Sequence, residues 1–384
     1  MARLEEICSL ITDGSHFSPE DEGVGYPMFS VKDMTPNGFN ISGCKKIGEE
    51  AYKKLVANGC KPLNDDVVVA KDGSYLKTAF VIKGNPEITL LSSIAILRPK
   101  IDLVVPEYLS YFLKSDAVYR TVSLNYITGT ALKRIILKGI RKIEVDLPDI
   151  GEQEQRAQRL SKVDYLCQLR KQQLAKLDEL VKARFVEMFG DINVNNKKWM
   201  TYPLGELCTI VRGGSPRPIE RYLGGTIPWI KIGDATTGEN IYLNSTKEYI
   251  IQEGVKKSRM IKAGSLIFAN CGVSLGFARI ITFDGCIHDG WLAMEDIDEK
   301  LDKIFLLYSL NQMTEYFRKT APAGTQPNLN TNIMKMHRQI VPPMEMQKAF
   351  ISFVKCADRQ KQIVQQSLEK LELMKKSLMQ EYFG

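Results

Sequence analysis

Histidine is scarce in this chain of 384 residues, with only His16, His288 and His337 present, far apart in the sequence. A histidine-based metal centre is therefore not expected. The eight cysteines form no Cys-x-x-Cys pair, so the sequence also has no zinc-site pattern. We expect reduced and mostly buried thiols rather than a disulfide framework.

Long apolar runs are also missing. No stretch of about 18 apolar residues occurs, so the sequence predicts no transmembrane helix. The first residues, Met1–Glu6, carry acids where a signal peptide needs a basic and then an apolar stretch. We therefore expect a cytoplasmic protein without a membrane partner.

The sequence motifs of several enzyme classes are absent as well. We find no G-x-x-x-x-G-K-[ST] phosphate loop, no G-x-G-x-x-G turn between a strand and a helix, and no G-x-S-x-G elbow. No Pro-Pro motif flanked by aromatics, as in amino-methyltransferases, occurs. Pro148-Asp149 with Glu152 lacks the Glu-x-Lys of a nuclease site. We predict no catalytic residue, metal or cofactor on this chain, which has the features of a binding protein.

Length and charge fit a soluble protein with two or three domains. There are 52 Lys plus Arg and 45 Asp plus Glu residues, which gives a formal charge of +7 and a pI near 8.8. This mildly basic balance permits a polyanionic partner without requiring one.

An internal repeat organises the sequence. Residues 148–190 and 342–384 align without a gap at an offset of 194, with 12 identities in 43 positions. Chance alone would give about three. Each segment begins at a proline, has no proline or glycine beyond its first turn, and ends in Phe-Gly, which predicts two long helices with a C-terminal glycine cap.

The apolar spacing in both helices is of the 3-4 type, and the two frames coincide under the offset. We predict a two-helix coiled coil within the chain. Arg170, Arg184, Lys361 and Lys375 interrupt the stripe, and either extend out of the seam or mark where it opens for partner helices. The predicted seam consists of Leu160, Val163, Cys167, Leu174, Leu177, Val181, Met188, Val354, Ala357, Val364, Leu368, Leu371, Leu378 and Tyr382.

The segments before the helices also repeat, more faintly. Leu4–Ser15 parallels Leu204–Ser215, and Tyr26–Asp33 parallels Ile227–Asp234. Residues 66–70 and 265–269 are predicted strands, and 106–119 and 303–318 predicted helices whose aromatics belong to the core. The expected fold is α+β, with internal two-fold pseudo-symmetry and two globular domains separated by two long antiparallel coiled-coil helices. The expected segments are a first domain at 1–147, a helix at 148–190, a second domain at 191–341 that begins with a polar linker, and a helix at 342–384.

At this point the chain resembles a known family. Each helix begins with a Pro-x-hydrophobic-x-x-Gln phrase, at Leu147–Gln153 and Val341–Gln347, and the second domain carries Ile227–Asp234 and Gly324–Asn330. Together these phrases resemble the DNA-specificity subunit of type I restriction–modification systems, over essentially the whole chain. The first domain departs from the phrases at Tyr26–Ser30 and Gly129–Leu132.

The resemblance implies a non-catalytic subunit whose two target-recognition domains each read one half of a split double-stranded DNA sequence. It implies that the helices set the gap between the halves and dock two methyltransferase subunits. It also implies restriction/translocase subunits in the assembly. S-adenosylmethionine, ATP and Mg are then expected on those partner subunits and not on this chain.

Candidate DNA contacts follow from residue type, since Lys and Arg bind phosphate, Arg pairs with guanine, and Asn or Gln pairs with adenine. For any one of them, a solvated charge or a turn-forming residue is an equally good interpretation. The candidates are His16, Lys32, Lys71, Lys77, Lys133 and Arg134 in the first domain, and Arg212, Arg217, Lys231, Arg279, Arg318, Lys319, Gln326, Asn328 and Asn330 in the second.

Two other functions remain open from the sequence. One is a separate recognition part of a fused restriction–methylation enzyme, which neighbouring genes would reveal. The other is a two-lobed coiled-coil scaffold that binds proteins and no DNA. The target sequence itself cannot be derived from the chain, because shape readout leaves no motif.

Overall fold

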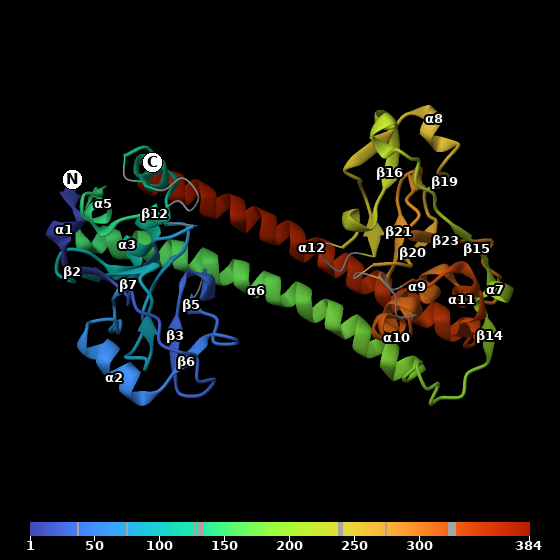
Figure 1. Ribbon diagram of the computed structural model, residues 1–384, viewed down its shortest axis with the longest axis horizontal. Coiled ribbons are helices and arrows are strands. Elements are labelled where there is room, and N and C mark those ends of the chain that lie inside the picture. Colours follow the sequence, from blue (N-terminus) through green and yellow to red (C-terminus); the bar gives the residue numbers. More distant parts are fainter. Residues whose placement is uncertain are drawn as a thin grey trace. The chain divides into compact units, whose positions relative to one another are not determined.

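The structure, a computed structural model, describes residues 1–36, 38–73, 76–125, 127–128, 134–236, 241–272, 275–321 and 328–384. The chain divides into two units (Figure 1). Unit 1 comprises residues 1–171 and 366–384, and unit 2 comprises residues 172–365. Each unit therefore contains one domain and one half of each of the two long helices.

The domain of unit 1 is built around the antiparallel sheet β2-β10-β7-β8, beside a smaller sheet β6-β3-β9. Its strands are β1 (Ala2–Arg3), β2 (Cys8–Asp13), β3 (Tyr26–Phe29), β4 (Met34–Thr35), β5 (Gly38–Phe39), β6 (Lys45–Ile47), β7 (Val67–Ala70), β8 (Ala79–Val81), β9 (Thr89–Leu90), β10 (Ile94–Pro99), β11 (Ile127–Thr128), β12 (Arg134–Ile135) and β13 (Glu144–Val145). Its helices are α1 (Leu4–Ile7), the 3-10 turn Val31–Asp33, α2 (Glu49–Ala57), α3 (Pro106–Leu113), α4 (Asp116–Asn125) and α5 (Leu137–Arg141).

The domain of unit 2 repeats this plan, with a sheet β15-β23-β20-β21-β17 and a second sheet β18-β16-β22-β19. Its strands are β14 (Thr201–Pro203), β15 (Thr209–Arg212), β16 (Leu223–Ile230), β17 (Tyr242–Leu243), β18 (Glu248–Ile250), β19 (Arg259–Ile261), β20 (Leu266–Ala269), β21 (Ala278–Ile281), β22 (Gly285–Ile287), β23 (Trp291–Glu295) and β24 (Arg338–Ile340). Its helices are α7 (Leu204–Leu207), α8 (Gln252–Val255), α9 (Lys303–Gln312), α10 (Thr314–Thr320), α11 (Thr331–Met336) and the 3-10 turns Ile219–Arg221 and Ile232–Asp234.

Both predicted strands are confirmed, as β7 and β20, and every residue in them is buried. Such apolar runs fit strands covered on both faces. The helices predicted at 106–119 and 303–318 are instead each broken in two. The first forms α3 and α4, and the second forms α9 and α10. In unit 1 the cause is Ser115, whose hydroxyl accepts a hydrogen bond from the Val118 N–H and so starts a new helix.

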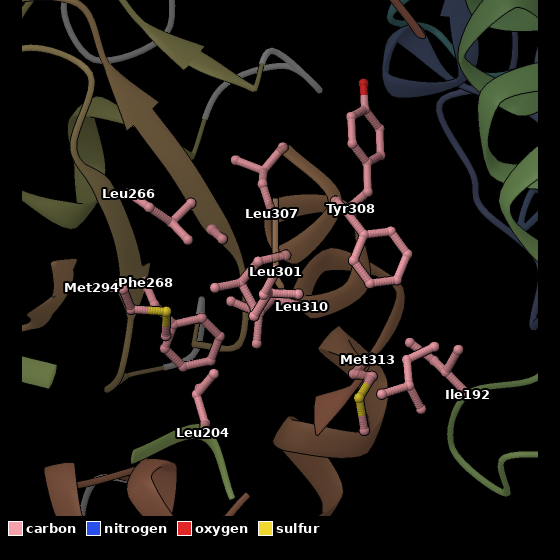
Figure 2. Close-up of a cluster of buried hydrophobic side chains, with 14 of the residues drawn as sticks. Ile192, Leu204, Leu266, Phe268, Met294, Leu301, Leu307, Tyr308, Leu310 and Met313 are labelled. Atoms are coloured by element: carbon pink, nitrogen blue, oxygen red, sulfur yellow. The ribbon is translucent and has the colours of Figure 1, made fainter. Parts of the chain in front are cut away.

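The cores contain most aromatics of the segments 106–119 and 303–318, as predicted, whereas Tyr316 is exposed and Tyr119 is half-buried. In unit 1, Tyr108 and Phe112 of α3 are buried, and in unit 2 Phe305 and Phe317 are buried. Figure 2 shows part of the unit 2 core, where Leu307 and Leu310 of α9 meet Leu266 and Phe268 of β20.

The two long helices are α6 (Ile150–Phe189) and α12 (Met344–Phe383), each with 40 residues. Gly190 and Gly384 follow them in the left-handed region, at φ +77° and +82°, which confirms the predicted glycine caps. In unit 1 the helices run antiparallel, since Asp164 pairs with Lys375 at 2.5 Å and Lys171 pairs with Glu372 at 3.0 Å. The predicted α+β fold with antiparallel helices is therefore confirmed.

The helix seam is apolar and crossed by polar bonds. Arg170 donates to the Ser367 hydroxyl at 3.1 Å, Lys375 pairs with Asp164, and Lys361 of unit 2 pairs with Asp178. These cations hold the helices together, so the seam is not opened at them. Of the predicted seam residues, Leu160, Val163, Cys167, Val181, Val354, Ala357, Val364 and Leu368 are buried, while Leu174, Leu177, Met188, Leu371, Leu378 and Tyr382 are half-buried.

A buried glutamine joins the start of each long helix to its own domain. The side-chain oxygen of Gln153 accepts a hydrogen bond from the Val105 N–H at 2.9 Å, and its side-chain NH2 group donates to the backbone carbonyls of Leu103 and Pro148. Gln347 makes the equivalent three bonds, to the Asp302 N–H and to the Lys300 and Pro342 carbonyls. We call each set of three bonds the glutamine clamp. It explains why glutamine recurs in both repeats.

The last turn of each helix enters the domain of the other repeat. Phe383 of α12 packs on Tyr108 in unit 1, with ring centroids 5.2 Å apart. Phe189 of α6 packs on Phe305 in unit 2 at 4.8 Å. Each domain is thus attached to one helix start and one helix end.

Replacing Gln347 with Met removes the clamp in unit 2 and leaves its backbone partners buried without these bonds. We expect a loss of about 2–4 kcal/mol in the free energy of unfolding of unit 2. All three tryptophans, Trp199, Trp229 and Trp291, lie in unit 2, so fluorescence in a urea titration reports on that unit. Gln362→Met, at an exposed position of α12, is the control, and equal urea midpoints for the two variants would contradict the clamp.

Acid is expected to destabilise unit 2 through His337. Burial lowers the pKa of His337 from 6.5 to about 4, and its ring lies 5.1 Å from that of Phe317. Because the pKa is lower in the folded state, this contribution to stability is complete above pH 6.5 and is lost as the pH falls toward 4. On acidification, unit 2 loses free energy of unfolding, and we expect His337→Phe to remove about 2–3 kcal/mol of this loss. Tryptophan fluorescence in urea titrations at several pH values measures it. His16→Gln, in unit 1, serves as the control and leaves the acid sensitivity unchanged.

Candidate nucleic-acid interface

The first domain gathers charged side chains where two strands end. Asp13 is the last residue of β2 and pairs with Ala95 of β10. Lys71 follows the last residue of β7, Ala70, which pairs with Ile94 of the same strand. Lys71 is buried and forms an ion pair with Asp13. A phosphate contact needs an exposed cation, so this geometry does not support Lys71 as a DNA contact.

Two other candidates of the first domain, His16 and Arg134, lie near this pair at the surface. The His16 side chain is 80% exposed, and its Nε2 lies 3.6 Å from Asp13 Oδ1. Arg134 pairs with Asp72 at 3.3 Å beside the same strand end. Lys32 is exposed, and Lys77 lies 5.2 Å from the ring centroid of Tyr119. Lys133 lies outside the described residues.

The second domain brings Arg212 and Arg217 together around Asp289. The Arg212 Nε donates to the Asp289 carbonyl at 2.9 Å, and Arg217, 83% exposed, approaches its carboxylate at 3.9 Å. Ser215 donates to the same carboxylate at 2.8 Å. The backbone carbonyl of Asp289 orients Arg212 and its carboxylate lies near Arg217, so both guanidinium groups are held at one residue, a useful arrangement for contacts with base edges.

The Gly-Gly-Ser turn in this loop has a structural role as well. A Cβ at Gly213 would overlap the backbone carbonyl of His288. Ser258 donates to the Gly214 carbonyl at 2.8 Å, which holds the turn against the next segment. The motif thus allows close backbone packing that brings Arg212 and Arg217 to one place.

Lys231 lies beside this arginine pair. It forms an ion pair with Glu248, and its ammonium lies 5.6 Å from the ring centroid of Trp229. The same Trp229 ring packs against His288, at 5.5 Å. Burial lowers the pKa of His288, which keeps its imidazole neutral near pH 7.

Arg279 and Arg318 occupy a different place in unit 2. Both line a cavity of about 430 Å³, in which the Arg279 guanidinium lies 4.6 Å from the ring centroid of Phe277 and Arg318 pairs with Glu315. The next residue, Lys319, is exposed. The structure therefore divides the predicted cations of this domain between two sites.

The candidate amides have internal partners. Asn328 accepts a hydrogen bond from the buried Asn270 at 3.2 Å. Asn330 caps α11 by accepting the N–H groups of Asn332 and Ile333. Asn330 is thus explained by its helix-capping role. Gln326 lies outside the described residues.

Sequence reasoning missed Arg259. This exposed arginine donates to the Arg212 carbonyl at 3.0 Å, so it belongs to the surface around Arg212. The run Lys256-Lys257-Ser258-Arg259, with three cations in four residues, is the signal that could have found it.

A second candidate surface lies on the long helices, opposite the seam. At 100° per residue, five exposed residues of each helix fall within an arc of about 120°, and the two sets correspond at the offset of 194. Three pairs are identical, and the two others are apolar in both helices. We call these sets the outer stripes. They are Gln168, Leu169, Gln172, Lys176 and Leu180 on α6, and Gln362, Ile363, Gln366, Lys370 and Met374 on α12.

Metal and thiol chemistry receives no support from the described residues. They contain no group of three or more His, Cys, Asp or Glu side chains placed to hold a metal ion. The eight cysteines are free, and burial raises the pKa of Cys8 and Cys208 to about 12. Within the same residues, no helix has the length and apolar character that crossing a membrane requires.

Comparisons with known proteins agree with the repeat. The model of the type I restriction modification DNA specificity domain matches residues 1–179 and 196–373. A putative type I restriction enzyme MjaX specificity subunit of Methanocaldococcus jannaschii is 22% identical, over 98% of this chain and 90% of the relative. The MjaVIII specificity subunit of the same organism is 23% identical, over 85% of this chain and 79% of that relative.

Solved structures show the same fold. A chain from a study of complex assembly and conformational transition of the type I R-M system superimposes with a TM-score of 0.61 at 17% identity, covering 100% of this chain and 96% of that one. The S subunit of the type I restriction–modification system of M. genitalium gives a TM-score of 0.56 at 15% identity, covering 100% and 95%. With both repeats matched by the domain model, the chain belongs to the family of type I restriction–modification DNA-specificity subunits.

Proposed function

We propose that this chain is the non-catalytic subunit that gives a type I restriction–modification complex its DNA sequence specificity. Each domain reads one half of a bipartite double-stranded target, and the helices set the separation of the halves. The observation that carries the proposal is the duplicated architecture, in which the strand order β2-β10-β7-β8 of unit 1 recurs as β15-β23-β20-β21 in unit 2, while the charged residues near the ends of these strands differ. Two differing reading surfaces on one repeated scaffold suit an asymmetric target.

The modest charge agrees with this role. A net charge of +7 over 384 residues is small for a protein that grips DNA alone. In this proposal the grip is shared with two methyltransferase subunits, which carry S-adenosylmethionine, and with restriction/translocase subunits, which use ATP and Mg. The whole complex acts in the cytoplasm.

The outer stripes are the proposed docking surface for the methyltransferases. Some identities between the repeats are explained by packing, namely the buried pair Gln153 and Gln347, and Phe189 with the half-buried Phe383. Packing does not explain the exposed identities. Two copies of the same partner subunit, each bound to one stripe, would account for them.

Specificity is tested by methylome sequencing of cells that carry the chain with its methyltransferase. We expect one bipartite motif that contains methylated adenine. Arg217→Ala lowers affinity for this motif about tenfold and relaxes only the half read by the second domain. Lys335→Ala, another exposed cation of that domain, is the control in a DNA-binding titration over salt concentration. Binding that is indifferent to salt and sequence would instead support a protein-binding scaffold.

Docking is tested by replacing Gln168, Gln172 and Lys176 with Ala, which preserves helix propensity. We expect this variant to retain one methyltransferase instead of two, because only the α6 stripe is changed. Changing Gln362, Gln366 and Lys370 as well is expected to remove both. Native mass spectrometry of the purified complex counts the subunits.

The control for docking changes the exposed Glu50 and Lys54 of α2 to Ala. If the variant with both stripes changed still carried two methyltransferase subunits, docking on these faces would be wrong. A control variant that also lost them would show that the loss is not specific to the stripes.

A further inference from the structure

A cavity of about 850 Å³ lies in unit 1 at the corner between α3 and α4, and none of the functions above uses it. Residues of the last part of α12 line it as well, and so does Asp164 of α6. This volume is in the range of small-molecule sites. The residues discussed below all belong to unit 1.

Lys114, at the end of α3, is an ammonium without a counter-charge in this cavity. Its Nζ lies 4.5 Å from the ring centroid of Tyr111, and no described carboxylate forms an ion pair with it. Burial lowers the pKa of Lys114 to about 8, the positive charge of Lys375 lowers it further, and Asp164 opposes the shift. Asp164 itself is committed to Lys375 and to the Tyr111 hydroxyl.

A desolvated and unpaired charge is costly, and proteins usually supply it with a partner. Because the described residues offer Lys114 none, an anion from outside would gain most at this position. Positive charge is in excess around the cavity, which is lined by the five cations Lys77, Lys114, Arg120, Lys375 and Lys376 and by the three carboxylates Asp116, Asp164 and Glu372. This excess favours an anionic ligand.

The remaining walls suit a flat apolar body. Tyr111, Tyr119 and Phe383 line the cavity, and Met379 adds a polarizable side chain. Aromatic rings of this kind stack on planar groups and strengthen contacts with a base. The cavity thus offers both cations and aromatic rings, which suit a ligand that carries an anionic group and a planar body.

The equivalent cavity of unit 2 lacks this arrangement. Tyr308 corresponds to Tyr111 at an offset of 197, which places Asn311 at the position of Lys114. The Asn311 side-chain amide already has hydrogen-bond partners, since its oxygen accepts from the Ala278 N–H at 2.7 Å and its NH2 group donates to the Ala278 carbonyl. The cavity there is about 430 Å³. The unpaired ammonium is thus a feature of unit 1 and not of the repeated scaffold.

We propose that the cavity between α3, α4 and α12 of unit 1 binds a nucleoside phosphate. The phosphoryl group sits at Lys114, with Lys77 and Lys376 completing its charge balance. The base lies against Tyr111, Tyr119 and Phe383. The binding involves no chemical step.

Isothermal titration calorimetry of the full chain with AMP tests this site, with inorganic phosphate and adenosine as partial probes. We expect AMP to bind more tightly than either part, because both ends of the cavity contribute. Lys114→Met weakens AMP binding at least about tenfold, since a charge-assisted contact is lost. Lys54→Met removes an exposed charge from α2 of the same domain and leaves AMP affinity within about twofold.

Far-UV circular dichroism and thermal melting of Lys114→Met show whether the fold is kept, and Tyr119→Leu gives a second variant that alters only the base wall. Absence of AMP binding at millimolar concentrations would overturn the proposal. So would an unchanged affinity in a folded Lys114→Met chain, or phosphate that binds as tightly as AMP. If AMP did not bind and Lys114→Met instead lost the methyltransferase, the occupant would be a partner protein and the nucleotide site would be wrong.

Discussion

The architecture of each unit depends on the glutamine clamp. One amide side chain, buried at Gln153 or Gln347, satisfies three backbone groups from two segments. In unit 1 those groups lie just before α3 and just before α6, and in unit 2 they lie just before α9 and just before α12. A buried backbone group left unpaired is costly, so the clamp permits one angle at which the long helix leaves its domain.

The long helices separate their two tasks by face. Their inner faces are apolar, with ion pairs such as Asp164–Lys375 and Asp178–Lys361 that fix the register of each antiparallel segment. Because these cations are used within the pair, they leave the opposite faces to the outer stripes. In the proposed function, recognition and assembly use different surfaces, because the candidate DNA contacts belong to the domains and the outer stripes to the long helices. A domain could then change its reading residues without altering the proposed docking surface.

Much of the fold could be predicted from the sequence, and less of the site. The helices were predictable because proline, the apolar frame and Phe-Gly all act locally, and the strands at 67–70 and 266–269 because they are continuous apolar runs. The break at Ser115 depends on one hydroxyl bond that periodicity does not register. Lys71 and Asn330 have residue types suited to DNA, yet Asp13 and a helix cap use them. Such partners are distant in sequence or specific to local geometry, so residue type alone could not reveal them.

The packing of Phe383 against Tyr108 and Phe112 has a consequence for biosynthesis. Unit 1 includes residues 366–384, so its core closes only after this segment has been synthesised. At about 5–20 residues per second, the interval between Phe112 and Phe383 is on the order of tens of seconds. Unit 2, which is complete at residue 365, becomes available for closure first. Of the two domains, the one whose synthesis begins first is therefore completed last, and Tyr108 and Phe112 lack Phe383 as a packing partner during that delay.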